Sequence, residues 1–136
     1  MYTDSADLSP SLPGAAVRIL VVDDDPALLR LSICILSPRF EVLIAHNGRE
    51  ALSIIQGHGV DLVITDLVMP EMEGLELIRL LHDQNPSLPI IAMSGALCGQ
   101  YLEVALKFGA QMTVFKPFSA VNLINAVERV LQRETP

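Results

Sequence analysis

Short apolar segments alternate along the chain with longer segments of helical spacing. Five runs rich in Val and Ile have the length and composition of buried strands. The predicted strands are Val17–Val22, Phe40–Ala45, Val60–Thr65, Pro89–Met93 and Met112–Phe115. The predicted helices run from Asp25-Pro26 to about Ser37, from Asn47-Gly48 to about Gly57, from about Gly74 to the residue before Asn85, over about Leu97–Phe108, and from Ser119 to about Gln132.

Strands that alternate with helices in this way predict a single doubly wound α/β domain, with one five-stranded parallel sheet and five helices covering both faces. The length of 136 residues suits one domain. We expect a flexible N-terminal tail at 1–16, which holds Pro10 and Pro13, then the domain at 17–133 and a short tail at 134–136. Ligands of such sheets bind beyond the carboxyl ends of the strands.

Polar side chains follow four of the five predicted strands. Asp23 and Asp24 come directly after the first strand, Asp66 after the third, Ser94 after the fourth and Lys116 after the fifth. We expect the first and third strands to be neighbours, so that their carboxylates converge. Clustered carboxylates repel one another, and a hard divalent cation such as Mg²⁺ removes that repulsion. The pattern predicts a magnesium site at this edge of the sheet.

This set of side chains suits phosphoryl transfer. A carboxylate can attack phosphorus, the Lys116 ammonium and the metal can neutralise the transferred oxygens, and the Ser94 hydroxyl can donate to one of them. Each residue alone has a plainer explanation, since Asp25 before Pro26 reads as a helix cap and a lone lysine is usually solvated. Their joint placement at one edge favours the functional interpretation, in which the product is an aspartyl phosphate.

At these residues the sequence resembles the receiver domain of two-component response regulators. The resemblance extends over about Val17–Leu131 and implies the flavodoxin-like strand order 2-1-3-4-5. The matching motifs are ILVVDDDP (Ile19–Pro26), DLVITDLVMPEMEG (Asp61–Gly74), IIAMSG (Ile90–Gly95) and GAQMTVFKPF (Gly109–Phe118). Each motif alone is a weak signal, whereas the spaced set is specific.

The resemblance also implies a role for each site residue. Asp66 corresponds to the phosphoacceptor. Asp24 would bind Mg²⁺ directly, Asp23 mostly through water, and Val68 through its backbone carbonyl, so the implied metal site is Asp23, Asp24, Asp66 and Val68. The implied catalytic set is Asp66, Lys116 and Ser94, in which Ser94 and Lys116 bind the phosphoryl oxygens. The bond between Lys116 and Pro117 would be cis.

The implied function is a signalling switch that catalyses its own modification, rather than an enzyme with a separate substrate. A sensor histidine kinase or a histidine phosphotransfer protein would supply the phosphoryl group, and the partner downstream would be an unidentified protein. A homodimer formed on phosphorylation is a further expectation. The net charge of −7, from 9 basic and 16 acidic residues, argues against direct binding to nucleic acid or a membrane. With neither a signal peptide nor a long apolar run, we expect a cytoplasmic protein.

The sequence departs from the family pattern at Thr113, where the family usually has an aromatic residue that moves inward on activation. The usual coupling between Ser94 and an aromatic side chain is therefore an open question, with a weaker output or a movement of the loop after Ser94 alone as the alternatives. Val68 and Ala96 are both apolar, whereas family members that lose the phosphoryl group quickly tend to have polar groups there. A decay slower than seconds is the resulting hypothesis.

Three other functions compete with this interpretation. The motif Ile19–Ala27 is close to that of haloacid dehalogenase-like phosphatases, with Asp23 as nucleophile and Asp25 as acid and base, but Asp66 would then have no role. A nucleotide or flavin binder would need Gly, Ser or Thr amides at the first turn, where this chain has acids. A degenerate receiver used only for protein contact is the third alternative, which Thr113 keeps open.

Overall fold

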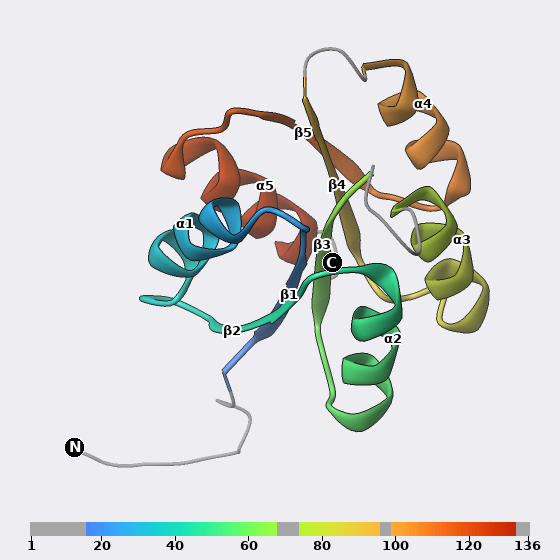
Figure 1. The fold of residues 1–136 in the computed structure, drawn as a ribbon, viewed down its shortest axis with the longest axis horizontal. Coiled ribbons are helices and arrows are strands. Elements are labelled where there is room, and N and C mark those ends of the chain that lie inside the picture. The colour runs from blue at the N-terminus through green and yellow to red at the C-terminus, as the bar shows by residue number, and fades with distance from the viewer. Residues whose placement is uncertain (1–15, 68–73, 96–98, 133–136) are drawn as a thin grey trace.

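The computed structural model describes residues 16–67, 74–95 and 99–132, and strands alternate with helices throughout this part of the chain (Figure 1). The elements are β1 (Arg18–Val22), α1 (Pro26–Leu36), β2 (Glu41–Ala45), α2 (Gly48–Gly57), β3 (Leu62–Asp66), α3 (Gly74–Gln84), β4 (Ile90–Gly95), α4 (Gly99–Phe108), β5 (Met112–Lys116) and α5 (Ala120–Gln132). Among the helices of the described residues, none is long and apolar enough to cross a membrane.

All strand pairs of the sheet are parallel, and the order is β2-β1-β3-β4-β5. This confirms the predicted fold and strand order. The last three strands, β3, β4 and β5, reach further toward their carboxyl ends than predicted, because Asp66, Ser94 and Lys116 still pair with their neighbours. Asp66 lies opposite Met93, and Lys116 lies opposite Gly95. Asp66, Ser94 and Lys116 are therefore held in the sheet itself, whereas Asp23 and Asp24 follow β1 as predicted.

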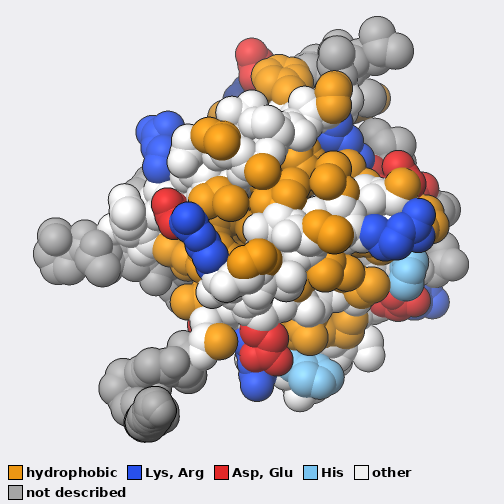
Figure 2. Space-filling model, turned by 90° about the vertical axis from the view of Figure 1, so that its left-hand side faces the viewer, with side chains coloured by type: hydrophobic (Ala, Val, Ile, Leu, Met, Phe, Trp, Pro, Cys, Tyr) orange, Lys and Arg blue, Asp and Glu red, His pale blue; other side chains and the backbone are white. Residues whose placement is uncertain are grey.

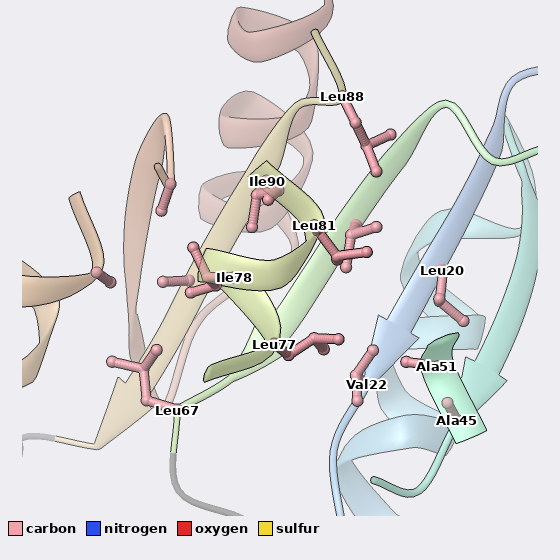
Figure 3. Close-up of a cluster of buried hydrophobic side chains, with 14 of the residues drawn as sticks. Leu20, Val22, Ala45, Ala51, Leu67, Leu77, Ile78, Leu81, Leu88 and Ile90 are labelled. Atoms are coloured by element: carbon pink, nitrogen blue, oxygen red, sulfur yellow. The ribbon is translucent and has the colours of Figure 1, made fainter. Parts of the chain in front are cut away.

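The helices form a layer on each face of the sheet. Figure 1 shows α1 and α5 on one side and α2, α3 and α4 on the other. Successive strand residues point to opposite faces, so Leu20 belongs to the core under α2, α3 and α4, and Val21 to the core under α1 and α5. Figure 3 shows Leu77, Ile78 and Leu81 of α3 in the first of these cores.

Side-chain N-caps mark the first residues of α1 and α5. The Asp25 carboxylate accepts the backbone N–H of Ala27 at 3.0 Å, and Pro26 occupies the first turn of α1, as predicted. At α5, the Ser119 hydroxyl accepts the N–H of Asn122 at 3.0 Å. Because α1 begins directly after β1, its cap fixes the chain next to Asp23 and Asp24.

One face of the molecule is markedly apolar. Figure 2 looks onto the side where α1 and α5 lie in Figure 1, and hydrophobic side chains extend over much of it. Leu31 of α1 and Val121 of α5 are 46% and 65% exposed. These two helices therefore present apolar side chains to the outside as well as to the core.

Candidate functional site

The carboxyl edge of the sheet brings together acidic and basic side chains from three strands. The Lys116 ammonium lies 2.8 Å from Asp23 Oδ2 and 3.0 Å from Asp66 Oδ1. Asp23 follows β1, Asp66 ends β3, and Lys116 ends β5. Residues separated by as much as 93 positions along the chain are thus in direct contact. One lysine bridges two carboxylates that would otherwise repel each other.

This cluster is largely removed from water. Asp23 is 0% exposed and Asp66 is 8% exposed, whereas Asp24 lies on the surface. Asp23 also accepts the backbone N–H of Asp25 at 2.9 Å through its other oxygen. Charges that are buried this far must be paired or hydrogen-bonded to be tolerated. The contacts with Lys116 meet that requirement in part.

The pKa shifts show that the contacts with Lys116 do not fully compensate the two aspartates for their loss of water. Burial raises the pKa of both Asp23 and Asp66 above 3.8, although the hydrogen bonds from Lys116 act in the opposite direction. For Lys116, burial acts to lower the pKa, but the hydrogen bonds and charges of Asp23 and Asp66 outweigh it, so the pKa rises above 10.5. Desolvation therefore dominates at the carboxylates, and attraction dominates at the ammonium.

The donor set fits a hard divalent cation. Asp23, Asp24 and Asp66 each offer a carboxylate oxygen, and these oxygens lie within 4.8 Å of one another. Three carboxylates and the single ammonium of Lys116 leave two negative charges (3 − 1 = 2), which a divalent cation would balance. Oxygen-only ligands favour Mg²⁺ over Zn²⁺. Val68, the fourth ligand implied by the family resemblance, lies outside the described residues.

Ser94 lies at the same edge, on the strand between those of Asp66 and Lys116. It follows Met93, the partner of Asp66, and precedes Gly95, the partner of Lys116. The residue is 2% exposed, and its hydroxyl donates to the Gly95 carbonyl at 3.4 Å. Along β4, Ser94 therefore stands between the strand partners of Asp66 and Lys116. Lys116 is followed by a cis bond to Pro117, as predicted.

Two residues near Asp66 were missed by sequence reasoning. The Thr65 hydroxyl donates to the Asp66 backbone carbonyl at 2.8 Å, and Gly74 packs against the same carbonyl. A hydroxyl within an otherwise apolar strand was the available signal for Thr65. For Gly74 the sequence indicated only the start of a helix, since the closeness of that helix to β3 depends on tertiary packing.

Thr113, at the position where the family usually has an aromatic residue, lies on β5 and borders an open cleft. The residue pairs with Ala92 and is half-buried. It lines a cleft of about 410 Å³ between β5 and α5, which Asn122, Asn125 and Arg129 also line. Ala96, the apolar residue near Ser94, lies outside the described residues.

The phosphatase alternative does not fit the positions of the acids. It requires Asp25 as an acid and base beside Asp23, but the exposed Asp25 carboxylate caps α1 and is not one of the three converging acids. Asp66, which has no role in that alternative, contacts Lys116 instead. The geometry thus favours Asp66 over Asp25 as the second functional carboxylate.

Fold and site together define a doubly wound α/β protein with an acidic site at the carboxyl edge of its sheet. The family model described as the response regulator receiver domain matches residues 19–128. The chain therefore belongs to the family of response regulator receiver domains, the signalling modules of two-component systems.

Curated relatives include a response regulator and a transcriptional regulatory protein. The chain is 37% identical over 123 residues to the response regulator MprA of Mycolicibacterium vanbaalenii, a match that covers 88% of this chain and 52% of that protein. It is 28% identical to the transcriptional regulatory protein TrcR of Mycobacterium tuberculosis, over 90% of this chain and 48% of that protein. The chain spans about half the length of these relatives.

Solved structures with the same fold include one chain of similar length and one much longer chain. A CheY-like receiver domain protein from Methanospirillum hungatei superposes with a TM-score of 0.82 at 31% identity, covering 88% of this chain and 96% of that one. NtrX from Brucella abortus, in a structure with ADP, gives 0.83 at 33% identity and covers 87% of this chain and 27% of that one. The chain is thus similar to nearly the whole of one solved chain and to about a quarter of another.

Proposed function

We propose that this chain is a phosphorylation switch, which accepts a phosphoryl group on Asp66 from a sensor histidine kinase or a histidine phosphotransfer protein. The observation that carries the proposal is the buried contact of Lys116 with both Asp66 and Asp23. Membership of the receiver family supports it. Asp66 is the proposed nucleophile because it ends the central strand of the sheet beside this ammonium.

The proposed reaction transfers a phosphoryl group to a side-chain oxygen. An Asp66 carboxylate oxygen attacks phosphorus, and a new O–P bond forms. The bond between phosphorus and the imidazole nitrogen of the donor breaks, its electron pair stays on that nitrogen, and the donor histidine can then be protonated. The product is an aspartyl phosphate, a mixed anhydride that water can later hydrolyse.

The surrounding residues would stabilise the charge that moves with the phosphoryl group. The Lys116 ammonium, already 3.0 Å from Asp66, would pair with a transferred oxygen, and the Ser94 hydroxyl would donate to another. Asp23, Asp24 and Asp66, together with the Val68 carbonyl, would hold Mg²⁺, which when bound supplies positive charge close to those oxygens. The domain would therefore contribute most of the catalysis itself.

Phosphorylation would then change how the protein contacts its partners. A phosphoryl group adds about 1.5 to 2 negative charges near neutral pH. Lys116 would be drawn from Asp23 and Asp66 toward the new oxygens, which biases the packing around Ser94, Lys116 and the last two helices. A downstream protein, or a second copy of the chain, would respond to that change. Direct nucleic-acid or membrane binding is not part of the proposal, and we place the protein in the cytoplasm.

Intact-mass measurement after incubation with acetyl phosphate and Mg²⁺ tests the proposal. We expect one added phosphoryl group on the wild type, none on Asp66→Asn and none in the presence of chelator. Asp61→Asn serves as the matched control, since Asp61 is exposed at the opposite edge of the sheet and should leave labelling intact. Labelling of Asp66→Asn, or turnover of a phosphoester that requires Asp23 but not Asp66, would contradict the proposal.

A further inference from the structure

The backbone carbonyl of Asp66 is bound on the face of the sheet opposite its carboxylate. Val63 and Leu67 belong to the core under α3, whereas Ile64 belongs to the core under α1 and α5. By strand alternation, Thr65 points toward α3, and the Asp66 side chain points to the other face. The buried Thr65 hydroxyl donates to the Asp66 carbonyl at 2.8 Å. Asp66 is therefore held from both faces, by Thr65 on one and Lys116 on the other.

Gly74 holds the same peptide from the start of α3. A Cβ atom at Gly74 would lie 1.8 Å from the Asp66 carbonyl oxygen and 2.7 Å from Leu67 Cα, far inside any real contact. The Gly74 N–H also donates to the Leu67 carbonyl at 3.0 Å. Only a hydrogen atom fits at this position. Its small size allows the first turn of α3 to pack directly against the peptide that follows Asp66. By contrast, Gly57 has open space where a Cβ would lie.

These contacts bear on reactivity because a backbone and its side chain share one Cα. Displacement of the Asp66–Leu67 peptide would carry the Asp66 Cα with it, and so move the attached carboxylate relative to Lys116, now 3.0 Å distant. An attacking oxygen must be aligned with the phosphorus atom, and a misplacement of about 1 Å can lower a rate on the order of 100-fold. The position of this peptide therefore helps to determine where the attacking Asp66 oxygen lies relative to the phosphorus atom.

We propose that Thr65 and Gly74 are positioning residues for Asp66, which fix the Asp66–Leu67 peptide against α3 and so aim the carboxylate at Lys116 and the incoming phosphorus. This inference rests on the proposed function. Neither residue touches the reacting atoms. Their effect passes through the backbone of Asp66 alone, which distinguishes it from the direct roles proposed for Lys116 and Ser94.

Two substitutions at Thr65 separate positioning from stability. Thr65→Val keeps the shape and removes the hydroxyl, whereas Thr65→Ser keeps the hydroxyl. With acetyl phosphate and Mg²⁺, we expect the maximal phosphorylation rate of folded Thr65→Val to fall at least about tenfold, since alignment is lost. The donor concentration at half-maximal rate should stay unchanged, and Thr65→Ser should recover most of the rate. Urea unfolding, run in parallel, gives the folded fraction by which each rate is corrected.

A glycine pair provides the second comparison. Gly74→Ala should slow phosphorylation by at least about tenfold through displacement of the same peptide. Gly57→Ala, in a helix with open space around it, should leave the rate unchanged. If Gly74→Ala fails to fold, the Thr65 pair decides the question.

A measurement without metal or phosphoryl donor completes the test. The carbonyl ¹³C resonance of Asp66 reports its hydrogen bond, so in chelator it should move in Thr65→Val and return toward the wild-type position in Thr65→Ser. Equal rates per folded molecule for wild type and Thr65→Val, or an unmoved resonance, would overturn the positioning role while the proposed function stands. A wild type that takes up no phosphoryl group would overturn both proposals.

Discussion

Two clusters of charged side chains lie at opposite edges of the same sheet, and they behave differently. At the amino edge, Arg18 Nε lies 3.1 Å from Glu41, and the two side chains are 43% and 48% exposed. At the carboxyl edge, Lys116 Nζ lies 2.8 Å from Asp23 and 3.0 Å from Asp66, and these side chains are 21%, 1% and 12% exposed. The distances are alike, so burial is the main difference.

Burial changes how strongly the charges of such a cluster interact with one another and with a ligand. An exposed ion pair contributes about 0–1 kcal/mol, because water solvates both partners well when they are apart. A buried cluster has lost that solvation, and its charges interact more strongly with one another and with any ion or phosphate that enters. The cluster at the carboxyl edge is therefore the one suited to chemistry, whereas the pair at the amino edge is suited to a solvated surface.

Location at the carboxyl edge does not by itself raise the pKa of a carboxylate. Glu50 also lies there, at the start of α2 just beyond the end of β2, but it is exposed. The backbone N–H of His46 donates to Glu50 at 2.8 Å, and this bond lowers the Glu50 pKa below 4.5. Burial raises the pKa of Asp23 and Asp66. Carboxylates at one edge thus shift in opposite directions according to their access to water.

The largest expected difference between the two clusters is in stability. Lys116→Met leaves two buried carboxylates without their cation, so we expect it to lower the free energy of unfolding by about 3 kcal/mol in chelator. Arg18→Met, the matched change at the amino edge, should alter it by less than about 0.5 kcal/mol. Urea denaturation of both variants measures the contrast. Similar losses for the two variants would contradict the role of burial.

Magnesium should stabilise the protein through the carboxyl edge alone. A ligand at 100 times its dissociation constant adds about 2.7 kcal/mol to a protein that binds it only when folded. We expect Mg²⁺ to raise the melting temperature of the wild type relative to chelator, and Asp24→Asn to remove most of that increase. Asp61→Asn, at the amino edge, should keep it. An equal response to Mg²⁺ in the wild type and Asp24→Asn would rule out the proposed ligand.

A buried polar group outside the site tests the cost of burial elsewhere in the molecule. Ser32 of α1 is 1% exposed, and in the described residues its hydroxyl oxygen has no hydrogen-bond partner. Ser32→Ala should stabilise the protein by about 1 kcal/mol, because it removes an unsatisfied group and favours the helix. Chemical denaturation measures the change. A loss of stability would instead indicate a water molecule that satisfies the hydroxyl.

The smallest expected effect is the pH dependence due to Glu50. Because its folded pKa is depressed, its contribution to stability is present above the ordinary value of 4.5 and is lost as the pH falls through the folded pKa. We expect the wild type to exceed Glu50→Gln by a few tenths of a kcal/mol near neutral pH, since exposed interactions are weak. The difference should vanish in acid, as urea titrations at the two pH values would show. A difference that grows in acid would contradict the assignment.

Local sequence chemistry was sufficient to predict the elements and the edge that carries the site. Apolar runs of strand length, helical spacing between them and a cap at Asp25 require only neighbours along the chain. Parallel strands also place all their carboxyl ends together, so the convergence of Asp23, Asp66 and Lys116 followed from topology. The ends of β3, β4 and β5 were predicted too short because ladder pairing, which extends to Asp66 and Lys116, depends on the neighbouring strand.

The sequence by itself determined the alternation of strands and helices, the family to which the chain belongs and the residue types at the carboxyl edge. Only the tertiary structure decided which acids lose their water, that Lys116 bridges two of them, and that Thr65 and Gly74 contact the Asp66 carbonyl. The physical reason is that solvent access and contact distances between distant residues depend on how the layers pack. Local propensity along the chain carries no information about that packing.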